Sequence, residues 1–188
     1  MKKKSKIIGF LSVLIIAAIA VFSLNGWTVQ ADNCRLDQSQ LQQNGGIAFG
    51  NNIVLGQTFV PSVQNRRVCK VKVSIRKNMA AGDLKLTVLD SRFGELDSAT
   101  IGAIPLGNSV QVFDFGCNGT PLDGHQFYGL KLESPASAVG AYTWKGAPNN
   151  PYVKPANQGK GWRNVNSGVG IWTDLGGLDY AFQIYLCD

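Results

Sequence analysis

The sequence predicts an all-β protein: a two-sheet antiparallel jelly-roll sandwich of about eight or nine strands, preceded by a signal peptide. In CKVKVSIRK, residues 69–77, apolar and polar side chains alternate, as expected of a strand with one buried face. Gly-rich turn sequences recur along the chain, and no window of about ten residues after position 31 carries a helical apolar stripe. Uneven spacing between strands and turns favours a sandwich over a closed barrel.

Residues 1–31 have the layout of a secretory signal. Lysines near the start precede an apolar run from Ile7 to Leu24, and Val29-Gln30-Ala31 is a typical cleavage sequence. The alternative is a retained membrane anchor, because a spanning helix needs about 20 apolar residues. Asn25 and Gly26 end the run where a cleaved signal should end. We therefore expect a secreted or otherwise extracytoplasmic protein, in the periplasm or at the cell surface, which meets a membrane only if the segment is uncleaved.

The basic charge of the chain belongs mostly to this segment. Removing residues 1–31 takes away four of the 18 Lys and Arg and none of the 12 Asp and Glu, which leaves a net charge of +2. Nucleic-acid binding therefore loses its main electrostatic support, and we expect no nucleic-acid partner.

We expect residues 32–52 to form an irregular extension and residues 53–188 to form one β-sandwich domain. Turn sequences such as Asp123-Gly124 and Gly176-Gly177 separate the expected strands. These strands are Ile53–Val60, Cys69–Lys77, Leu84–Asp90, Ala99–Ile104, Ser109–Phe115, Phe127–Glu133, Val139–Trp144, Val169–Thr173 and Tyr180–Leu186.

Four cysteines in an exported chain predict two disulfides. Cys69 begins one expected strand and Cys117 follows another, whereas Cys34 and Cys187 lie near the two ends of the mature chain. This arrangement favours Cys69–Cys117 and Cys34–Cys187 among the three connectivities that four cysteines allow. None of the cysteines has the CxxC spacing of a zinc site, and we expect no metal bound by thiolates.

The series LGQTFVPSV, VKVSIRK, GDLKLTVLDS, VQVFDF, PLDGHQFYGLKL, NPYVKP and DYAFQIY resembles bacterial secreted β-sandwich domains of the choice-of-anchor kind. Those domains in turn resemble carbohydrate-binding modules with a galactose-binding-like jelly roll. The resemblance covers about residues 53–186 and is more specific for the fold than for a ligand. It implies no catalytic residue, and the four cysteines depart from the commoner cysteine-free pattern.

Catalytic groups are sparse, and we expect no enzyme. His125, the only histidine, lies in a turn without a GxSxG elbow. No pair stands out among the carboxylates that could serve glycoside hydrolysis: Asp90, Glu95, Asp97, Asp114, Glu133, Asp174 and Asp179. We expect no cofactor. A structural calcium ion held by Asp174 and Asp179 is the alternative considered, although the DxDxDG loop typical of calcium sites is missing.

Aromatic and amide side chains gather between Tyr142 and Trp172. Sugar rings stack on Trp and Tyr, while amides and Arg bind their hydroxyls. Tyr142, Trp144 and Trp172 lie in expected strands, where core packing explains them better than a ligand does. Trp162, in an expected loop, and then Tyr152 are the strongest ligand candidates. The predicted ligand-binding set also contains Asn149, Asn150, Gln158, Arg163 and Asn164.

The sequence thus leads to a non-catalytic exported β-sandwich. We expect it to bind a carbohydrate or another cell-surface polymer through the loop face of residues 145–168. The alternative is a structural or adhesive surface protein that acts through protein–protein contacts.

Overall fold

The computed structural model describes residues 34–148, 159–165 and 171–187. The chain divides into two units, Met1–Asp32 and Asn33–Asp188, of which the first lies outside the described residues. The predicted signal peptide, residues 1–31, falls entirely in that first unit.

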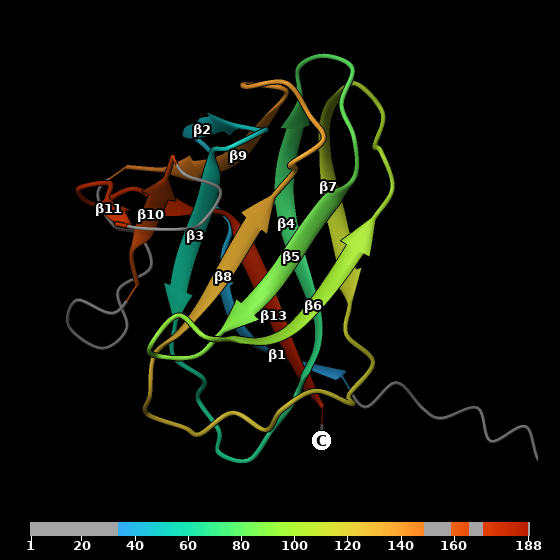
Figure 1. The fold of residues 1–188 in the computed structure, drawn as a ribbon. Coiled ribbons are helices and arrows are strands. Elements are labelled where there is room, and N and C mark those ends of the chain that lie inside the picture. The colour runs from blue at the N-terminus through green and yellow to red at the C-terminus, as the bar shows by residue number, and fades with distance from the viewer. Residues whose placement is uncertain (1–33, 149–158, 166–170, 188) are drawn as a thin grey trace, which may run out of the picture. The chain divides into compact units, whose positions relative to one another are not determined.

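The second unit is a two-layer antiparallel sandwich, which confirms the predicted fold class. A seven-stranded sheet has the order β1-β13-β4-β9-β12, with β2 added on β9 and β7 on β4. A six-stranded sheet has the order β11-β10-β3-β8-β5-β6. Figure 1 shows β3, β8, β5 and β6 in front of β4, β7 and β13.

The described strands number thirteen, more than the eight or nine expected. Their bounds are β1 Cys34–Gln40, β2 Gly45–Phe49, β3 Val54–Phe59, β4 Val68–Lys77, β5 Leu84–Leu89, β6 Glu95–Ile101, β7 Gly107–Asp114, β8 Tyr128–Glu133, β9 Tyr142–Ala147, β10 Gly161–Asn164, β11 Thr173–Asp174, β12 Asp179–Tyr180 and β13 Phe182–Cys187.

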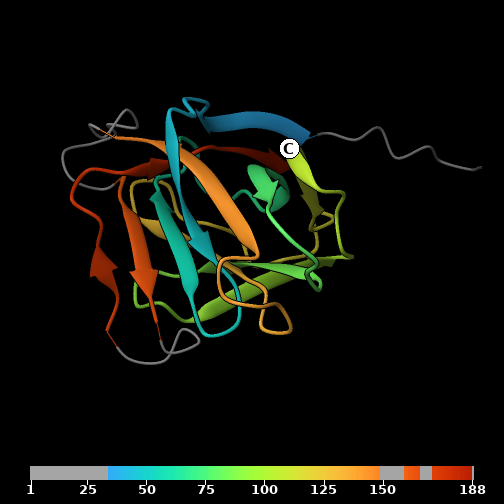
Figure 2. The same cartoon turned by 90° about the horizontal axis from the view of Figure 1, so that it is seen from above.

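The segment expected to be irregular, residues 32–52, contains two strands, so that prediction was wrong. β1 pairs with β13, and β2 pairs with β9. Figure 2 shows β2 alongside β9. β1 is hard to predict because its residues are mostly polar, and β2 because it is short and begins with two glycines; both are strands because neighbouring strands pair with their backbones. β1 therefore lies at the edge of the seven-stranded sheet beside β13, and β2 lies beside β9.

The core lies between the two sheets, and strands contribute to it through every second side chain. In β4, Val71, Val73 and Ile75 are buried, and lysines and other polar residues alternate with them. Tyr142 and Trp144 of β9 are fully buried, which confirms their predicted core role. The Trp144 ring stacks on the Tyr180 ring with centroids 4.5 Å apart. Each such large side chain stabilises the fold by roughly 1.5–3 kcal/mol through burial.

The disulfides differ from the predicted pairs, which were Cys69–Cys117 and Cys34–Cys187. The structure pairs Cys34 with Cys69 and Cys117 with Cys187. The prediction placed Cys117 opposite Cys69, but the register of β4 with β7 puts Phe115 there, and the Phe115 N–H donates to the Cys69 carbonyl.

The chain then turns through two residues with positive φ, Gly116 at 65° and Cys117 at 57°. This turn carries Cys117 beyond the end of β7, where it pairs with Cys187 at a Cα–Cα distance of 5.7 Å. Two disulfides are typical of proteins in an oxidising, extracytoplasmic compartment.

Candidate functional site

A small aromatic recess lies on the face of the six-stranded sheet that points away from the core. In β3, Leu55 and Gln57 are fully buried, so the alternation of strand side chains places Gly56 on the opposite, outer face. Trp162 of β10 pairs directly with Gly56 and therefore shares that face. We call this feature the aromatic recess; its lining residues are Gly56, Gln57, Thr58, Leu89, Phe93, Gly129, Leu130, Trp162 and Trp172.

Gly56 makes room for the ring of Trp172. A Cβ atom at position 56 would lie 3.1 Å from Cζ3 of Trp172, closer than ordinary van der Waals contact. At Gly129, on the neighbouring strand β8, a Cβ atom would lie 3.3 Å from the side chain of Leu89. Two glycines thus let large apolar side chains lie directly against the sheet, and these side chains form the floor of the recess.

Phe93 reaches the recess from the turn between β5 and β6. The Asp90 carboxylate accepts hydrogen bonds from the backbone N–H groups of Arg92 and Gly94, at 2.8 and 2.7 Å. This turn holds Phe93 at a φ of 65°, a left-handed conformation that is uncommon for a bulky residue. The Phe93 ring is 40% exposed and stacks on Trp172 with centroids 6.0 Å apart.

Polar groups lie at one rim of the recess. The Lys160 ammonium is 2.8 Å from the Asp174 carboxylate and 6.0 Å from the centre of the Trp162 ring. The hydrogen bond from Lys160, together with one from the Gly176 N–H, holds the pKa of Asp174 below its usual range. The rim therefore carries one cation and one anion at neutral pH. The Trp162 indole N–H has no hydrogen-bond acceptor among the described residues.

The three predicted ligand residues that the structure describes do not share one face. Trp162 belongs to strand β10, where a loop was expected, and it is partly exposed. Arg163 pairs with Leu55 and so lies on the core-facing side of the strand, away from Trp162. Asn164 is buried and donates from its amide to the Ile171 carbonyl. The other four predicted residues, Asn149, Asn150, Tyr152 and Gln158, lie outside the described residues.

Two aromatic residues of the recess were not predicted as site residues. Trp172 was expected in a strand and in the core, but it lies immediately before β11, partly exposed on the outer face. Phe93, in the turn between β5 and β6, was not among the candidate residues. An aromatic residue next to a turn glycine, with Asp three residues before the aromatic residue, was the available signal.

The carboxylates weighed for catalysis have local structural partners in the described chain. Glu95 and Glu133 pair with Lys131, and Asp174 pairs with Lys160. The remaining four accept hydrogen bonds from nearby groups: Asp90, Asp97, Asp114 and Asp179. His125 is exposed in its turn with a φ of 72°.

The calcium alternative gains no support from the described part of the chain. Asp174 is exposed and engaged by Lys160, whereas Asp179 is fully buried and accepts a hydrogen bond from the Gln57 amide at 3.1 Å. The two carboxylates thus serve separate contacts, one at the surface and one in the core.

A second surface feature lies on the outer side of the seven-stranded sheet. Leu41 and Val110, each 59% exposed, flank a shallow groove that we call the sheet groove. Its lining residues are Leu41, Gln43, Lys72, Val73, Ser74, Val110, Ala181, Phe182 and Gln183. Val112, two residues further along β7 and 46% exposed, extends the same apolar strip.

Neither the known protein-family models nor the curated protein sequences match this chain. Within the described ranges, no helix is both long and apolar enough to cross a membrane.

Proposed function

We propose that this chain is an exported, non-catalytic module that binds a carbohydrate or a related cell-surface polymer at the aromatic recess. The observation that carries the proposal is the convergence of Trp162, Trp172 and Phe93 on one outer sheet face, from β10, the residue before β11 and the turn between β5 and β6. Core packing does not require these rings, because each keeps part of its surface exposed.

The chemistry of the recess suits a sugar. Aromatic rings stack on the C–H faces of pyranose rings, and flanking polar groups bind hydroxyls. Lys160 can donate to a hydroxyl and Asp174 can accept from one, and the two lie at the rim beside Trp162. Because the recess is shallow, the ligand stacks across its rim and is not enclosed. This geometry favours a polymer, whose repeated weak contacts add up along the chain.

Affinity electrophoresis of the purified chain through gels that contain single soluble polysaccharides tests the proposal. We expect at least one polysaccharide to retard the chain, and Trp162→Ala or Trp172→Ala to reduce the retardation about tenfold. Tyr185→Ala is the matched control, since Tyr185 is a partly exposed aromatic residue on the other sheet. No retardation by any polysaccharide, or equal loss in the Tyr185 variant, would contradict the proposal.

A second candidate function is adhesion through protein–protein contacts, and the sheet groove is the observation that favours it. Leu41, Val110 and Val112 expose apolar surface on one sheet face. Size-exclusion chromatography with light scattering separates the two functions. A mass that rises with concentration, and that falls to the monomer in Val110→Lys, supports adhesion; a monomer at every concentration counts against self-association.

A further inference from the structure

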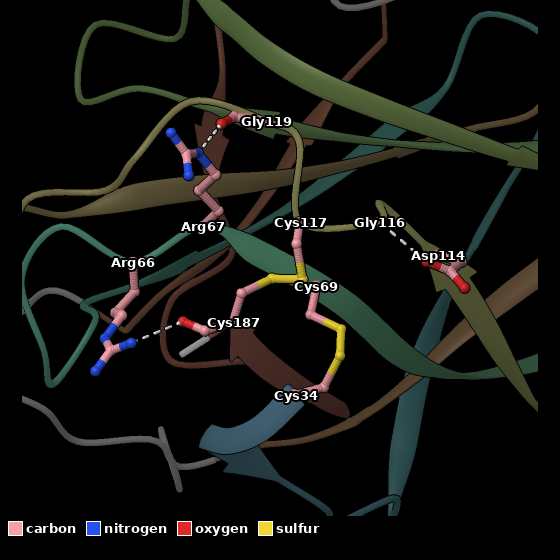
Figure 3. Close-up of a disulfide and its surroundings, with 9 residues drawn as sticks. All are labelled: Cys34, Arg66, Arg67, Cys69, Asp114, Gly116, Cys117, Gly119 and Cys187. Atoms are coloured by element: carbon pink, nitrogen blue, oxygen red, sulfur yellow. Dashed lines mark hydrogen bonds between the residues drawn. A yellow bond between two sulfur atoms is a disulfide. The ribbon is translucent and has the colours of Figure 1, made fainter. Parts of the chain in front are cut away.

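All four cysteines gather at one end of the seven-stranded sheet. Cys34 begins β1, Cys69 lies near the start of β4, and Cys187 ends β13. Cys117 joins them from the turn that follows β7 (Figure 3). The Sγ atoms of Cys34, Cys69 and Cys117 all lie within 4.8 Å of one another, and Cys187 is bonded to Cys117.

We propose that, when both disulfides are reduced, these four cysteines form a site for one thiophilic divalent cation of the zinc type. Zinc binds four thiolates in a tetrahedron with Zn–S distances of about 2.3 Å, which places neighbouring sulfurs about 3.8 Å apart. Cys117 Sγ, within 4.8 Å of the Cys34 and Cys69 sulfurs, needs to approach them by about 1 Å at most, whereas the bonded Cys34 and Cys69 sulfurs must separate to about 3.8 Å once reduced. Reduction frees Cys187 as the fourth ligand.

Backbone contacts hold the four cysteines together independently of the disulfides. Cys34 and Cys187 are paired residues of the adjacent strands β1 and β13, and β13 pairs with β4. The Cys187 N–H donates to the Arg67 carbonyl at 2.9 Å. At β4, the Phe115 and Gly116 N–H groups donate to the Cys69 carbonyl and so hold the turn that carries Cys117. The ligands are thus positioned by the sheet before any metal binds.

The charge around the cluster suits a metal thiolate. A zinc ion with four thiolates carries a net charge of −2. Arg66 donates from Nη1 to the Cys187 carbonyl, and Arg67 donates from Nε to the Gly119 carbonyl at 2.8 Å (Figure 3). The two arginines thus add positive charge at this end of the molecule, opposite in sign to a metal thiolate.

The disulfide and metal states exclude each other. A dithiol supplies two electrons and two protons to each disulfide and becomes a disulfide itself. A phosphine supplies the two electrons and becomes a phosphine oxide, while water supplies the oxygen and both protons. The cation then displaces the protons of the four thiols as the metal–sulfur bonds form. The site therefore belongs to the reduced chain, before its cysteines are oxidised.

Cobalt(II) binding to the chain tests this proposal, because tetrahedral cobalt thiolates absorb strongly in the near-ultraviolet and visible. The chain is reduced anaerobically with a phosphine, titrated with Co²⁺ and then with Zn²⁺. We expect one equivalent of Co²⁺ to give thiolate-to-cobalt bands, and one equivalent of Zn²⁺ to remove them. The oxidised chain should give no bands, since its sulfurs carry no thiolate.

Circular dichroism in the same titration distinguishes loss of the fold from loss of the site. Cys187→Ser should bind Co²⁺ at least tenfold more weakly than the reduced parent chain while keeping the β-sheet signal. The absence of thiolate bands, or equal Co²⁺ affinity in Cys187→Ser, would overturn the proposal. So would loss of the sheet signal on reduction that Zn²⁺ does not restore.

Discussion

At the scale of single residues, Gly56 determines whether Trp172 can lie against the sheet. Replacing Gly56 with alanine puts a methyl group 3.1 Å from the Trp172 ring, so the ring must shift by a few tenths of an ångström. We expect Gly56→Ala to shift the tryptophan emission and to weaken polysaccharide retardation several-fold.

The matched control for Gly56→Ala is Gly102→Ala, because a Cβ atom at Gly102 meets nothing within 4 Å. Tryptophan emission spectra and affinity electrophoresis of both variants provide the measurement. Identical spectra and retardation for Gly56→Ala and the parent chain would mean that Trp172 is not held as described.

Tyr180 makes the stability of the fold sensitive to alkaline pH. Burial raises the pKa of its phenol far above the usual range, and the charge of Arg163 offsets this only in part. In the unfolded chain the phenol ionises near pH 10. Below about pH 10 the proton is bound in both states and Tyr180 adds no pH dependence. Above it, the unfolded chain alone loses the proton, so the free energy of unfolding falls by about 1.4 kcal/mol per pH unit.

Denaturant unfolding of Tyr180→Phe between pH 8 and about pH 11.5 tests this expectation. The phenol oxygen has no hydrogen-bond partner among the described residues, so the variant should match the parent chain within about 1 kcal/mol at pH 8. Above pH 10 it should lose stability less steeply. A loss as steep as that of the parent chain would show that Tyr180 does not carry the effect.

At the scale of strands, a buried polar contact joins the two sheets. The Gln57 amide of β3 donates to the Asp179 carboxylate of β12, and its oxygen accepts from the Tyr180 N–H at 2.8 Å. Both side chains are fully buried, so each depends on a hydrogen-bonding environment inside the protein. The link positions β12 beside the end of β10, since the Gly161 N–H donates to the Leu178 carbonyl.

Replacing Gln57 with leucine keeps the volume but removes both of these hydrogen bonds and a third, from the Gln57 amide to the Thr58 carbonyl. We expect a loss of about 2 kcal/mol or more in the free energy of unfolding, because a buried carboxylate and a buried N–H each lose a partner. Gln111→Leu on the edge strand β7, where the side chain is partly exposed, should change it by about 0.5 kcal/mol or less. Comparable denaturation midpoints for the two variants would refute this role of Gln57.

Strands in which apolar and polar residues alternate clearly could be predicted from the sequence, and short strands without this alternation could not. In β4 the alternation of valine with lysine fixes both the strand and its buried face. β10 has only four residues, Gly161–Asn164, and no apolar alternation; it is a strand because β3 and β11 pair with it. For the same reason Trp162 was identified by its residue type but assigned to a loop.

At the scale of the whole molecule, the fold class follows from local pattern, whereas long-range pairing does not. Trp162 and Gly56 are opposite each other only because β10 pairs with β3 in one particular register. Nothing in the intervening sequence specifies that register, so the aromatic recess could not be predicted as a cluster. The disulfide pairs were predicted wrongly for a related reason: the left-handed turn at Gly116 and Cys117 carries Cys117 past the position opposite Cys69 and toward Cys187.

The central claim is that the ligand contacts the aromatic recess, and the indole N–H signals of the ¹⁵N-labelled chain test it most directly. The titrant is a polysaccharide that retards the chain. We predict that the Trp162 and Trp172 signals shift, while the signal of Trp144 stays in place, because Trp144 is fully buried and its indole N–H donates to the Ala181 carbonyl. Saturable binding that leaves the Trp162 and Trp172 signals unmoved would contradict the account.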